Sequence, residues 1–341
     1  MRSLITGGGG FIGSHLAEKL VKMKHKVIVI DNFSVGRKSN LHKIRNKIKI
    51  VDADILNKKN ISKYFKNIDN VFHLAARADI IPSIENPELY FDVNVKGTLN
   101  ILNASLKNKI KRFIYIASSS SYGIPKKYPT PENSPIDPQY PYALSKRMGE
   151  ELVMHYSKIY NLNSTSLRFF NVYGPRARTS GTYGAVFGVF LKQKLSGKPL
   201  TVVGNGKQSR DFTYVSDIVN SITTVAKNKK ISGKIFNVGS GKTVSINKIV
   251  NLLKGKKIYI PKRPGEPDVT FADISKIKKT LNWQPKINIE KGINLLLENI
   301  SSWKDAPLWT PKKIKKATEK WFIYLGKNKK WKIIKFVIQT Q

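Results

Sequence analysis

Short apolar runs alternate with segments of helical periodicity over residues 1–170 of the chain. The strand-like runs are Ser3–Thr6, Lys26–Asp31, Lys47–Val51, Asn70–Leu74, Arg112–Ala117 and Ser164–Phe169. The segments with helical spacing between them are Ser14–Met23, Ile61–Phe65, Leu89–Leu106 and Tyr142–Tyr160. This alternation predicts an α/β fold with a doubly wound parallel sheet, in which ligands bind where the strands end.

The pattern changes in the second half of the chain. Shorter elements and stretches rich in Gly and Pro, such as GPRARTSGTYG, VVGNGKQSRD and PKRPGEPD, occupy residues 171–302. They predict a smaller C-terminal substrate domain that is interleaved with the first one. A basic extension follows over residues 303–341, to which we assign no function. Its Trp309, Ile314 and Trp321 would cover the core or a partner subunit.

Glycines fill the turn between the first strand and the first helix, in the sequence MRSLITGGGGFIG. They fit Gly7-x-x-Gly10-x-x-Gly13 or Gly8-x-Gly10-x-x-Gly13. In such a turn one glycine permits the tight bend, the next lets the backbone approach a pyrophosphate, and the last lets the helix pack on the strand. The following strand ends at Asp31, where an acid can bond a ribose diol. This context predicts a Rossmann-like dinucleotide site in place of a plain turn.

The composition excludes several kinds of functional site. The chain has no Cys, which excludes disulfides, thiolate metal sites and a Cys nucleophile, and we expect no metal site. No apolar stretch reaches the ~20 residues of a membrane span. The N-terminus lacks a signal-peptide pattern. We therefore expect a cytoplasmic protein.

The net charge of +39 is the unusual feature of the composition. Such basicity is typical of proteins that bind nucleic acid or anionic surfaces. The excess consists of Lys scattered along the chain, whereas specific nucleic-acid sites favour clustered Arg and aromatic residues, so we expect no nucleic-acid partner. The tail NKKWKIIKFVIQTQ interleaves Lys with Trp331, Ile333, Ile334, Phe336 and Val337. It is either packed on the domain, which we favour, or weakly attracted to an anionic membrane.

Tyr142 and Lys146 lie four residues apart, on one face of a predicted helix. An ammonium lowers the pKa of a neighbouring phenol, so Tyr142 can act as a general base near neutral pH. Lys146 can also bond the ribose of a nicotinamide cofactor. The strand in RFIYIASSSSYG leads into four consecutive serines from Ser118, and a serine hydroxyl there can exchange a proton with Tyr142 and hold a substrate oxygen. The alternatives are a surface Tyr–Lys pair and a polar turn.

Arg is scarce in this chain, which makes Arg210 and Arg263, in loops rich in Gly and Pro, candidates for binding phosphate. A guanidinium binds phosphate in a bidentate manner. Together with Asn171 they form a candidate polar set. Structural pairing of the two arginines with Asp211 or Glu266 is the open alternative.

Taken together, these motifs resemble those of the extended short-chain dehydrogenase/reductase family, and within it the nucleotide-sugar epimerases and dehydratases. The resemblance runs from Met1 to about Pro285. Within the family, the sequence is most similar to 4-epimerases of UDP-glucose or UDP-N-acetylglucosamine. Its motifs are TGGGGFIG from Thr6, DN at Asp31, DI at Asp54, HLAA from His73, NVKGT from Asn94, Ser118 with Tyr122-Gly123, PYALSK from Pro141, RFFNVYGP from Arg168, GNGKQSRDFTYV from Gly204, NVGSG from Asn237 and RPGE from Arg263.

The resemblance implies NAD as the cofactor and assigns residues to it. The implied cofactor-binding residues are Gly7, Gly10, Phe11, Ile12 and Gly13 at the pyrophosphate, Asp31 and Asn32 at the adenosine ribose, Asp54 and Ile55 at the adenine, and Leu74, Ala75, Ala76, Asn94, Tyr142 and Lys146 toward the nicotinamide. Asp31, which no Arg directly follows, favours NAD over NADP because an acid repels a 2′-phosphate. The implied substrate-binding residues are Asn171, Arg210, Arg263 and Glu266, which would hold the nucleoside diphosphate.

The same resemblance implies a shared first step, in which Tyr142 takes the proton of the C4 hydroxyl, hydride passes to NAD and a 4-keto sugar forms. Related dehydratases carry an Asp-Glu pair directly after the residue at Ser118, and decarboxylases carry a Glu two residues after it. Here Ser119 and Ser120 occupy those positions, and a serine cannot serve as that acid or base at neutral pH. The sequence therefore favours 4-epimerisation. A dehydratase or decarboxylase, and a non-enzymatic NAD-binding scaffold at an anionic surface, are the alternatives.

Thr270 stands where epimerases restricted to plain hexoses tend to carry a large aromatic residue. A small residue there leaves room for a 2-N-acetyl group, so we expect UDP-glucose, UDP-galactose or their N-acetylamino forms as substrates. Relatives are often dimers through the helices beside the catalytic tyrosine, and a homodimer is expected by the same resemblance.

Overall fold

The computed structural model of the chain describes residues 1–177, 185–228 and 230–326. Its centre is a parallel sheet of seven strands in the order β11–β6–β5–β4–β1–β2–β3. The bounds are β1 (Arg2–Thr6), β2 (Lys26–Asp31), β3 (Ile48–Asp52), β4 (Asn70–His73), β5 (Arg112–Ser118), β6 (Ser164–Phe169) and β11 (Lys234–Val238). In β1, Leu4 joins the apolar cluster on one face of the sheet and Ile5 joins the cluster on the other. Strands buried on both faces are typical of parallel sheets, and the predicted doubly wound fold is confirmed.

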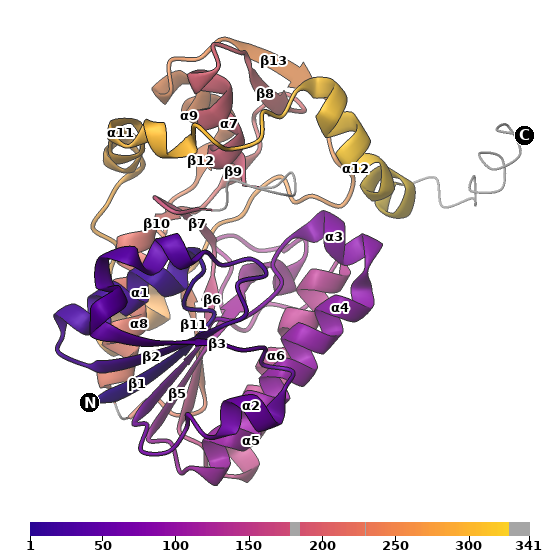
Figure 1. Cartoon of the computed structure of the whole chain (residues 1–341). Coiled ribbons are helices and arrows are strands. Elements are labelled where there is room, and N and C mark those ends of the chain that lie inside the picture. The colour runs from indigo at the N-terminus through magenta and orange to yellow at the C-terminus, as the bar shows by residue number, and fades with distance from the viewer. Residues whose placement is uncertain (178–184, 229, 327–341) are drawn as a thin grey trace, which may run out of the picture.

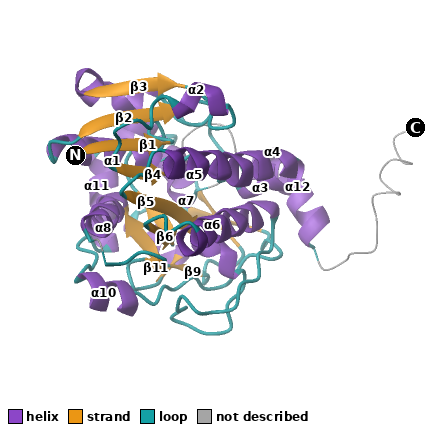
Figure 2. Cartoon of the chain, turned by 90° about the horizontal axis from the view of Figure 1, so that it is seen from below, coloured by secondary structure: helices purple, strands orange, loops and turns teal. Residues whose placement is uncertain are grey.

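Helices cover both faces of this sheet (Figure 2). On one face lie α1 (Phe11–Lys22) and α8 (Val215–Lys227), and on the other lie α2 (Lys58–Ser62), α5 (Gly97–Lys107) and α6 (Pro141–Ile159). In α8 the apolar Ile218, Ile222 and Val225 follow one another at spacings of four and three residues and are fully buried. This spacing gives one apolar stripe along the helix, which the sheet covers.

The second part of the molecule sits beyond the carboxyl ends of the central strands (Figure 1). It contains three two-stranded sheets, formed by β7 (Asn171–Tyr173) with β10 (Phe212–Tyr214), β9 (Ser209–Arg210) with β12 (Val244–Ser245), and β8 (Leu200–Val203) with β13 (Lys257–Ile260). Its helices are α7 (Val186–Leu195), α9 (Ile246–Leu252), α11 (Ile289–Glu298) and α12 (Pro311–Leu325), with a short 3-10 helix η4 (Ile300–Trp303). Helix α10 (Ser275–Leu281) instead packs against β11 of the large sheet. Because α8 and β11 return to the large sheet from this half of the chain, the predicted interleaving is confirmed.

Most of the predicted strands and helices recur with small shifts. The strands β2 and β6 have the predicted bounds, and the others differ by one residue at one or both ends. The helix predicted at Ile61–Phe65 instead covers Lys58–Ser62, because the side chain of Asn57 caps its first turn by accepting from the backbone N–H of Asn60. The remaining short elements are η1 (Lys38–Lys47), α3 (Ile80–Glu85) and η3 (Ser119–Tyr122).

The helical segment predicted over Leu89–Leu106 is confirmed, but a π turn interrupts its α-helical hydrogen bonding. Here the chain forms α4 (Pro87–Phe91), a π-helical turn η2 (Asp92–Lys96) and α5. The π turn contains Asn94, which is buried and bonds to groups far along the chain. Such turns often lie at functional sites.

No helix within the described residues is long and apolar enough to cross a bilayer. The lysine-rich tail from Trp331 to Val337, for which we weighed attraction to a membrane, lies outside those residues.

Candidate active site

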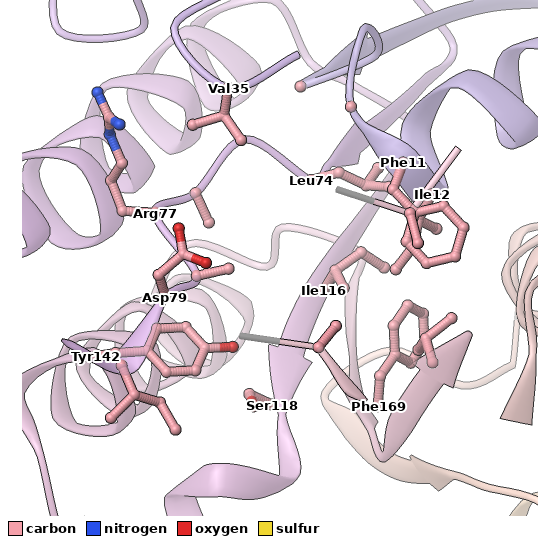
Figure 3. Close-up of a pocket in the computed structure, with 18 of the residues that line it drawn as sticks. Phe11, Ile12, Val35, Leu74, Arg77, Asp79, Ile116, Ser118, Tyr142 and Phe169 are labelled. Carbon is pink, nitrogen blue, oxygen red and sulfur yellow. The ribbon is translucent and has the colours of Figure 1, made fainter. Parts of the chain in front are cut away.

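A large cavity of about 650 Å³ opens where the central strands end. Its walls come from both parts of the molecule, and Figure 3 shows the region around the catalytic candidates. Of the sequence-predicted residues, it is lined by Gly7, Gly10, Phe11, Ile12, Gly13, Asp31, Asn32, Asp54, Ile55, Leu74, Ala75, Ala76, Ser118, Tyr142, Lys146, Asn171, Arg210, Arg263 and Glu266. The parallel strand order thus gathers residues from across the first 270 positions into one site.

The glycine turn fits tightly between β1 and α1. Gly7 has a positive φ of 70°, and a Cβ there would stand 2.6 Å from the backbone nitrogen of Ala75. A Cβ on Gly13 would stand 2.2 Å from the carbonyl oxygen of Gly7. Gly10 precedes α1, and no acidic side chain lies in the first turn of that helix. The amide groups at the N-terminus of α1 therefore face the cavity as a site for an anion.

Asp31 supports this turn from the end of β2. One oxygen of its carboxylate accepts from the backbone N–H of Gly9 at 2.8 Å, and the other accepts from that of Phe33 at 2.8 Å. Burial raises the pKa of this carboxyl, and the two backbone donors act in the opposite direction. Beside it, Asn32 donates to Asp54 at 2.8 Å. The predicted ribose and adenine residues therefore form one bonded group at the far end of the cavity.

Ser118, Tyr142 and Lys146 meet at the end of β5. Ser118 is the last residue of the strand, and its Oγ lies 2.7 Å from the Oγ of Ser120. Tyr142 lies in the first turn of α6, where Pro141 starts the helix, and its hydroxyl points into the cavity (Figure 3). Lys146 follows one turn later and is buried. A hydroxyl relay and a buried amine are therefore available at one point of the cavity.

The pKa of Tyr142 departs from the sequence-based expectation. Burial raises it, and the hydroxyls of Ser118 and Ser120 offset only part of that effect. The amine of Lys146 donates to the carbonyl oxygen of Ile116 at 2.5 Å. Burial lowers the pKa of Lys146 itself to about 7.

The two candidate phosphate-binding arginines share one carboxylate. Arg210 pairs with Glu266 at 2.9 Å, and Arg263 lies 3.8 Å from the other oxygen of Glu266. The structural pairing that the sequence left open is thus present, and all three side chains also line the cavity. Two guanidinium groups around one carboxylate leave a net positive charge, which suits a diphosphate.

Two predicted residues lie behind the wall of the cavity. Asn94 accepts from the backbone N–H of Arg77 at 2.8 Å and donates to Ser145 at 2.9 Å, so it holds the loop after β4 against α6. Thr270 donates to the side chain of Asn171 at 2.8 Å. Both therefore act on the site through a neighbour.

Asp79 is a cavity residue that the sequence reasoning missed. It lies near Tyr142 in Figure 3, and its negative charge contributes to the raised pKa of that phenol. Arg77, from the same loop, also lines the cavity but is directed away from Tyr142 (Figure 3). The signal in the sequence is the pair of charged residues in Arg77-Ala78-Asp79, which follows the HLAA motif. Within the described part of the chain, no group of three His, Asp or Glu residues could hold a metal ion.

Comparison with known proteins identifies the family. The family model described as GDP-mannose 4,6 dehydratase matches residues 4–296. The chain belongs to this family. A putative UDP-glucose 4-epimerase of Methanocaldococcus jannaschii is 38% identical over 298 residues, covering 85% of this chain and 95% of the relative. A UDP-N-acetyl-α-D-glucosaminuronate decarboxylase of Bacillus cytotoxicus is 36% identical over 313 residues, covering 86% and 95%.

A solved structure of the family carries its cofactor. The UDP-glucuronic acid 4-epimerase of Bacillus cereus, in complex with UDP-glucuronic acid and NAD, superimposes with a TM-score of 0.82 at 34% identity, covering 88% of this chain and 99% of that one. The chain is therefore an NAD-dependent member of the nucleotide-sugar epimerases, dehydratases and decarboxylases. Its own residues fit NAD, because the glycine turn has no room for a Cβ at Gly7 or Gly13 and Asp31 stands at the end of β2.

Proposed function

We propose that this enzyme is a 4-epimerase of nucleotide sugars, with UDP-sugars as substrates. The observation that carries the proposal is that Ser118, Tyr142 and Lys146 gather at the cavity, with hydroxyls at the two positions that follow Ser118. Ser120 bonds to Ser118, and neither it nor Ser119 can exchange a proton as a carboxylate does near neutral pH. An epimerase needs no further acid or base at this point.

The chain's own residues would act as follows. Tyr142 accepts the proton of the C4 hydroxyl, and Ser118 holds the C4 oxygen and relays the proton. When bound, NAD supplies a reversible hydride acceptor that takes C4 to the ketone and back. Tyr142 returns the proton after the keto sugar has presented its other face. Lys146 stabilises negative charge on the phenolate when its amine is protonated.

The substrate side supports a nucleoside diphosphate. Arg210, Arg263 and Glu266 would bind the diphosphate, and Asn171 would contact the nucleotide sugar beside them. We thus propose that residues 1–170 carry the cofactor and the catalytic groups, and that residues 171–302 mainly bind the nucleotide sugar. UDP is favoured because the two relatives and the solved structure above are all named for UDP-sugars.

The small Thr270 supports acceptance of N-acetylamino sugars. Its side chain ends at Asn171, which lines the cavity, so the space that a large aromatic residue at position 270 would take is left open for a 2-N-acetyl group. Assaying UDP-N-acetylglucosamine against UDP-glucose tests this. Strict rejection of the N-acetyl sugar would contradict it.

The decisive experiment offers the purified protein a panel of UDP-, dTDP- and GDP-sugars without added NAD and identifies the products by NMR. We expect the C4 epimer of a UDP-sugar, formed by cofactor that the enzyme retains. Tyr142→Phe should abolish turnover while leaving NAD bound. If the Phe variant keeps full activity, the assigned base is wrong.

Asp79 supports a 4,6-dehydratase as the second candidate. Dehydration also needs a carboxylate to remove the C5 proton, and Asp79 places one in the cavity near Tyr142. The product would then be a 4-keto-6-deoxy sugar, which NMR separates from a C4 epimer. Asp79→Asn should abolish dehydration but leave epimerisation measurable.

The exposed face of α6 supports a homodimer. Leu144 and Met148 are 42% and 37% exposed and lie one turn apart on this helix, and Ile159 at its end is 53% exposed. Exposed apolar side chains in a row are typical of surfaces that another chain covers.

A further inference from the structure

Helix α12 brings a residue from outside the family's matched segment into the cavity. The family match ends at residue 296, whereas α12 runs over Pro311–Leu325. Its buried face consists of Ile314, Thr318 and Trp321, and Trp321 lines the same cavity as Tyr142 and Arg263. The extension therefore supplies part of the wall of the substrate site.

Trp321 contacts the loop that carries the candidate phosphate-binding residues. Its indole Nε1–H donates to the carbonyl oxygen of Pro264 at 2.7 Å. The guanidinium of Arg263 lies 5.5 Å from the centre of the indole ring, within the range of a cation–π contact. Trp321 thus fixes the backbone beside Arg263 and the direction of its side chain.

Trp321 also reaches Tyr142 through one intermediate ring. The rings of Trp321 and Tyr140 are 6.4 Å apart. Tyr140 is stacked on Tyr142, with 6.3 Å between ring centroids and 9° between planes. The indole therefore contacts both the arginine that would hold the diphosphate and the pair of tyrosines where the sugar would react.

The helix is anchored to both parts of the molecule. Lys320 of α12 lies 3.7 Å from Glu85 of α3, and the two helices lie together in Figures 1 and 2. Just before α12, the carbonyl oxygen of Trp309 accepts from Gln193 of α7 at 2.7 Å. The extension therefore bridges the cofactor side and the substrate side of the cavity.

We propose that Trp321 is a positioning residue for the nucleoside diphosphate sugar. It holds Arg263 toward the diphosphate and Tyr140 against Tyr142, so that the phosphate contacts and the general base keep a fixed separation. This inference rests on the proposed function, since it assigns the same cavity to a nucleotide sugar.

The test compares three full-length variants by UDP binding in calorimetry and by steady-state kinetics on the best UDP-sugar. Trp321→Ala should weaken UDP binding and raise KM about threefold to thirtyfold, the range for loss of a partly buried cation–π contact. Trp321→Phe keeps an aromatic ring beside Arg263 and should recover most of that loss. Tyr324→Ala, on the exposed side of the same helix at 52% exposure, should match wild type.

The outcomes separate the two proposals. If wild type binds neither UDP nor any UDP-sugar, the proposed function fails and this inference fails with it. If wild type binds UDP and Trp321→Ala binds it equally well with unchanged KM, the inference alone is overturned, whatever the change in melting temperature. A thermal melt of each variant is recorded to verify that a raised KM belongs to folded protein.

Discussion

The amine of Lys146 donates to the carbonyl oxygen of Ile116 at 2.5 Å, which ties the catalytic helix α6 to the strand that ends at Ser118. The amine also lies 4.3 Å from the centre of the Tyr115 ring. These contacts hold Lys146 in a buried place, and burial lowers its pKa to about 7. The protein therefore keeps a costly charge next to its reaction site.

Lys146→Met should lower turnover by at least about a hundredfold, which is the lower end of the range for acid–base catalysis. The same variant should be more stable than wild type at low pH. The folded-state pKa is about 7 against a usual 10.5, so the unfolded chain binds more protons between these values and stability rises with pH across that window. The free-energy cost of burying the charged Lys146 is fully present below pH 7. Urea midpoints at pH 6 and pH 9 check this, because the advantage of the variant over wild type should shrink as pH rises. An advantage that grows with pH would contradict the assignment.

His73 should make the protein sensitive to acid. It is fully buried between Thr6 and Thr98, at 2.6 Å and 2.9 Å, and burial lowers its pKa to about 3 from 6.5. Only the unfolded chain then gains a proton as pH falls below 6.5, so stability is lost in that direction, by about 2 kcal/mol at pH 5. Denaturant unfolding at pH 7 and pH 5 measures this loss. His73→Gln should lack it, whereas a Gln at the exposed His155 should leave it unchanged.

Substitution of Gly10 and of Gly13 by alanine should have different effects on folding and on NAD binding. A Cβ on Gly13 would meet the carbonyl oxygen of Gly7 at 2.2 Å, so Gly13→Ala should yield little folded protein. At Gly10 the nearest atom would be 3.2 Å away, so Gly10→Ala should fold. Its added methyl group would instead obstruct the pyrophosphate and weaken NAD binding about tenfold or more. Circular dichroism and the NAD content of purified protein distinguish the two, and full NAD content in Gly10→Ala would contradict the cofactor placement.

The face of α6 that carries Leu144 and Met148 should control assembly. We expect wild type to be a dimer by light scattering after gel filtration, and the double variant Leu144→Glu, Met148→Glu to be a monomer, because paired charges disfavour an apolar interface. Tyr259→Glu, at another exposed apolar residue, is the matched control and should remain a dimer. A monomeric wild type would refute the proposed dimer.

The sequence predicted what depends on neighbours along the chain. The apolar runs located six strands, and the glycine turn and Asp31 do line one cavity, as the sequence led us to expect. Sequence reasoning failed where contacts between residues far apart in the chain determine the local structure or the pKa. The π turn at Asn94 depends on bonds to Arg77 and Ser145, which lie 17 and 51 residues away. The pKa of Tyr142 depends on burial by the whole fold.

Trp321 illustrates the same limit. Its partner Pro264 lies 57 residues earlier, and the extension that carries it lies beyond the segment covered by the resemblance. Apolar spacing alone predicted that it would cover either the core or a partner subunit. Only the folded arrangement shows that it lines the cavity that also contains Tyr142 and Arg263.

The return of β11 to the large sheet determines how the molecule can be built and divided. Its partner β6 ends at Phe169, and residues 170–233 must be made before β11 can pair with it. During synthesis the backbone groups along the edge of β6 therefore stay unpaired until β11 has been made. Such an unpaired edge can pair with a strand of another chain. A gene fragment cut at residue 170 would keep that edge permanently. Any exchange of the second part of the molecule between relatives must therefore leave α8 and β11 with the large sheet.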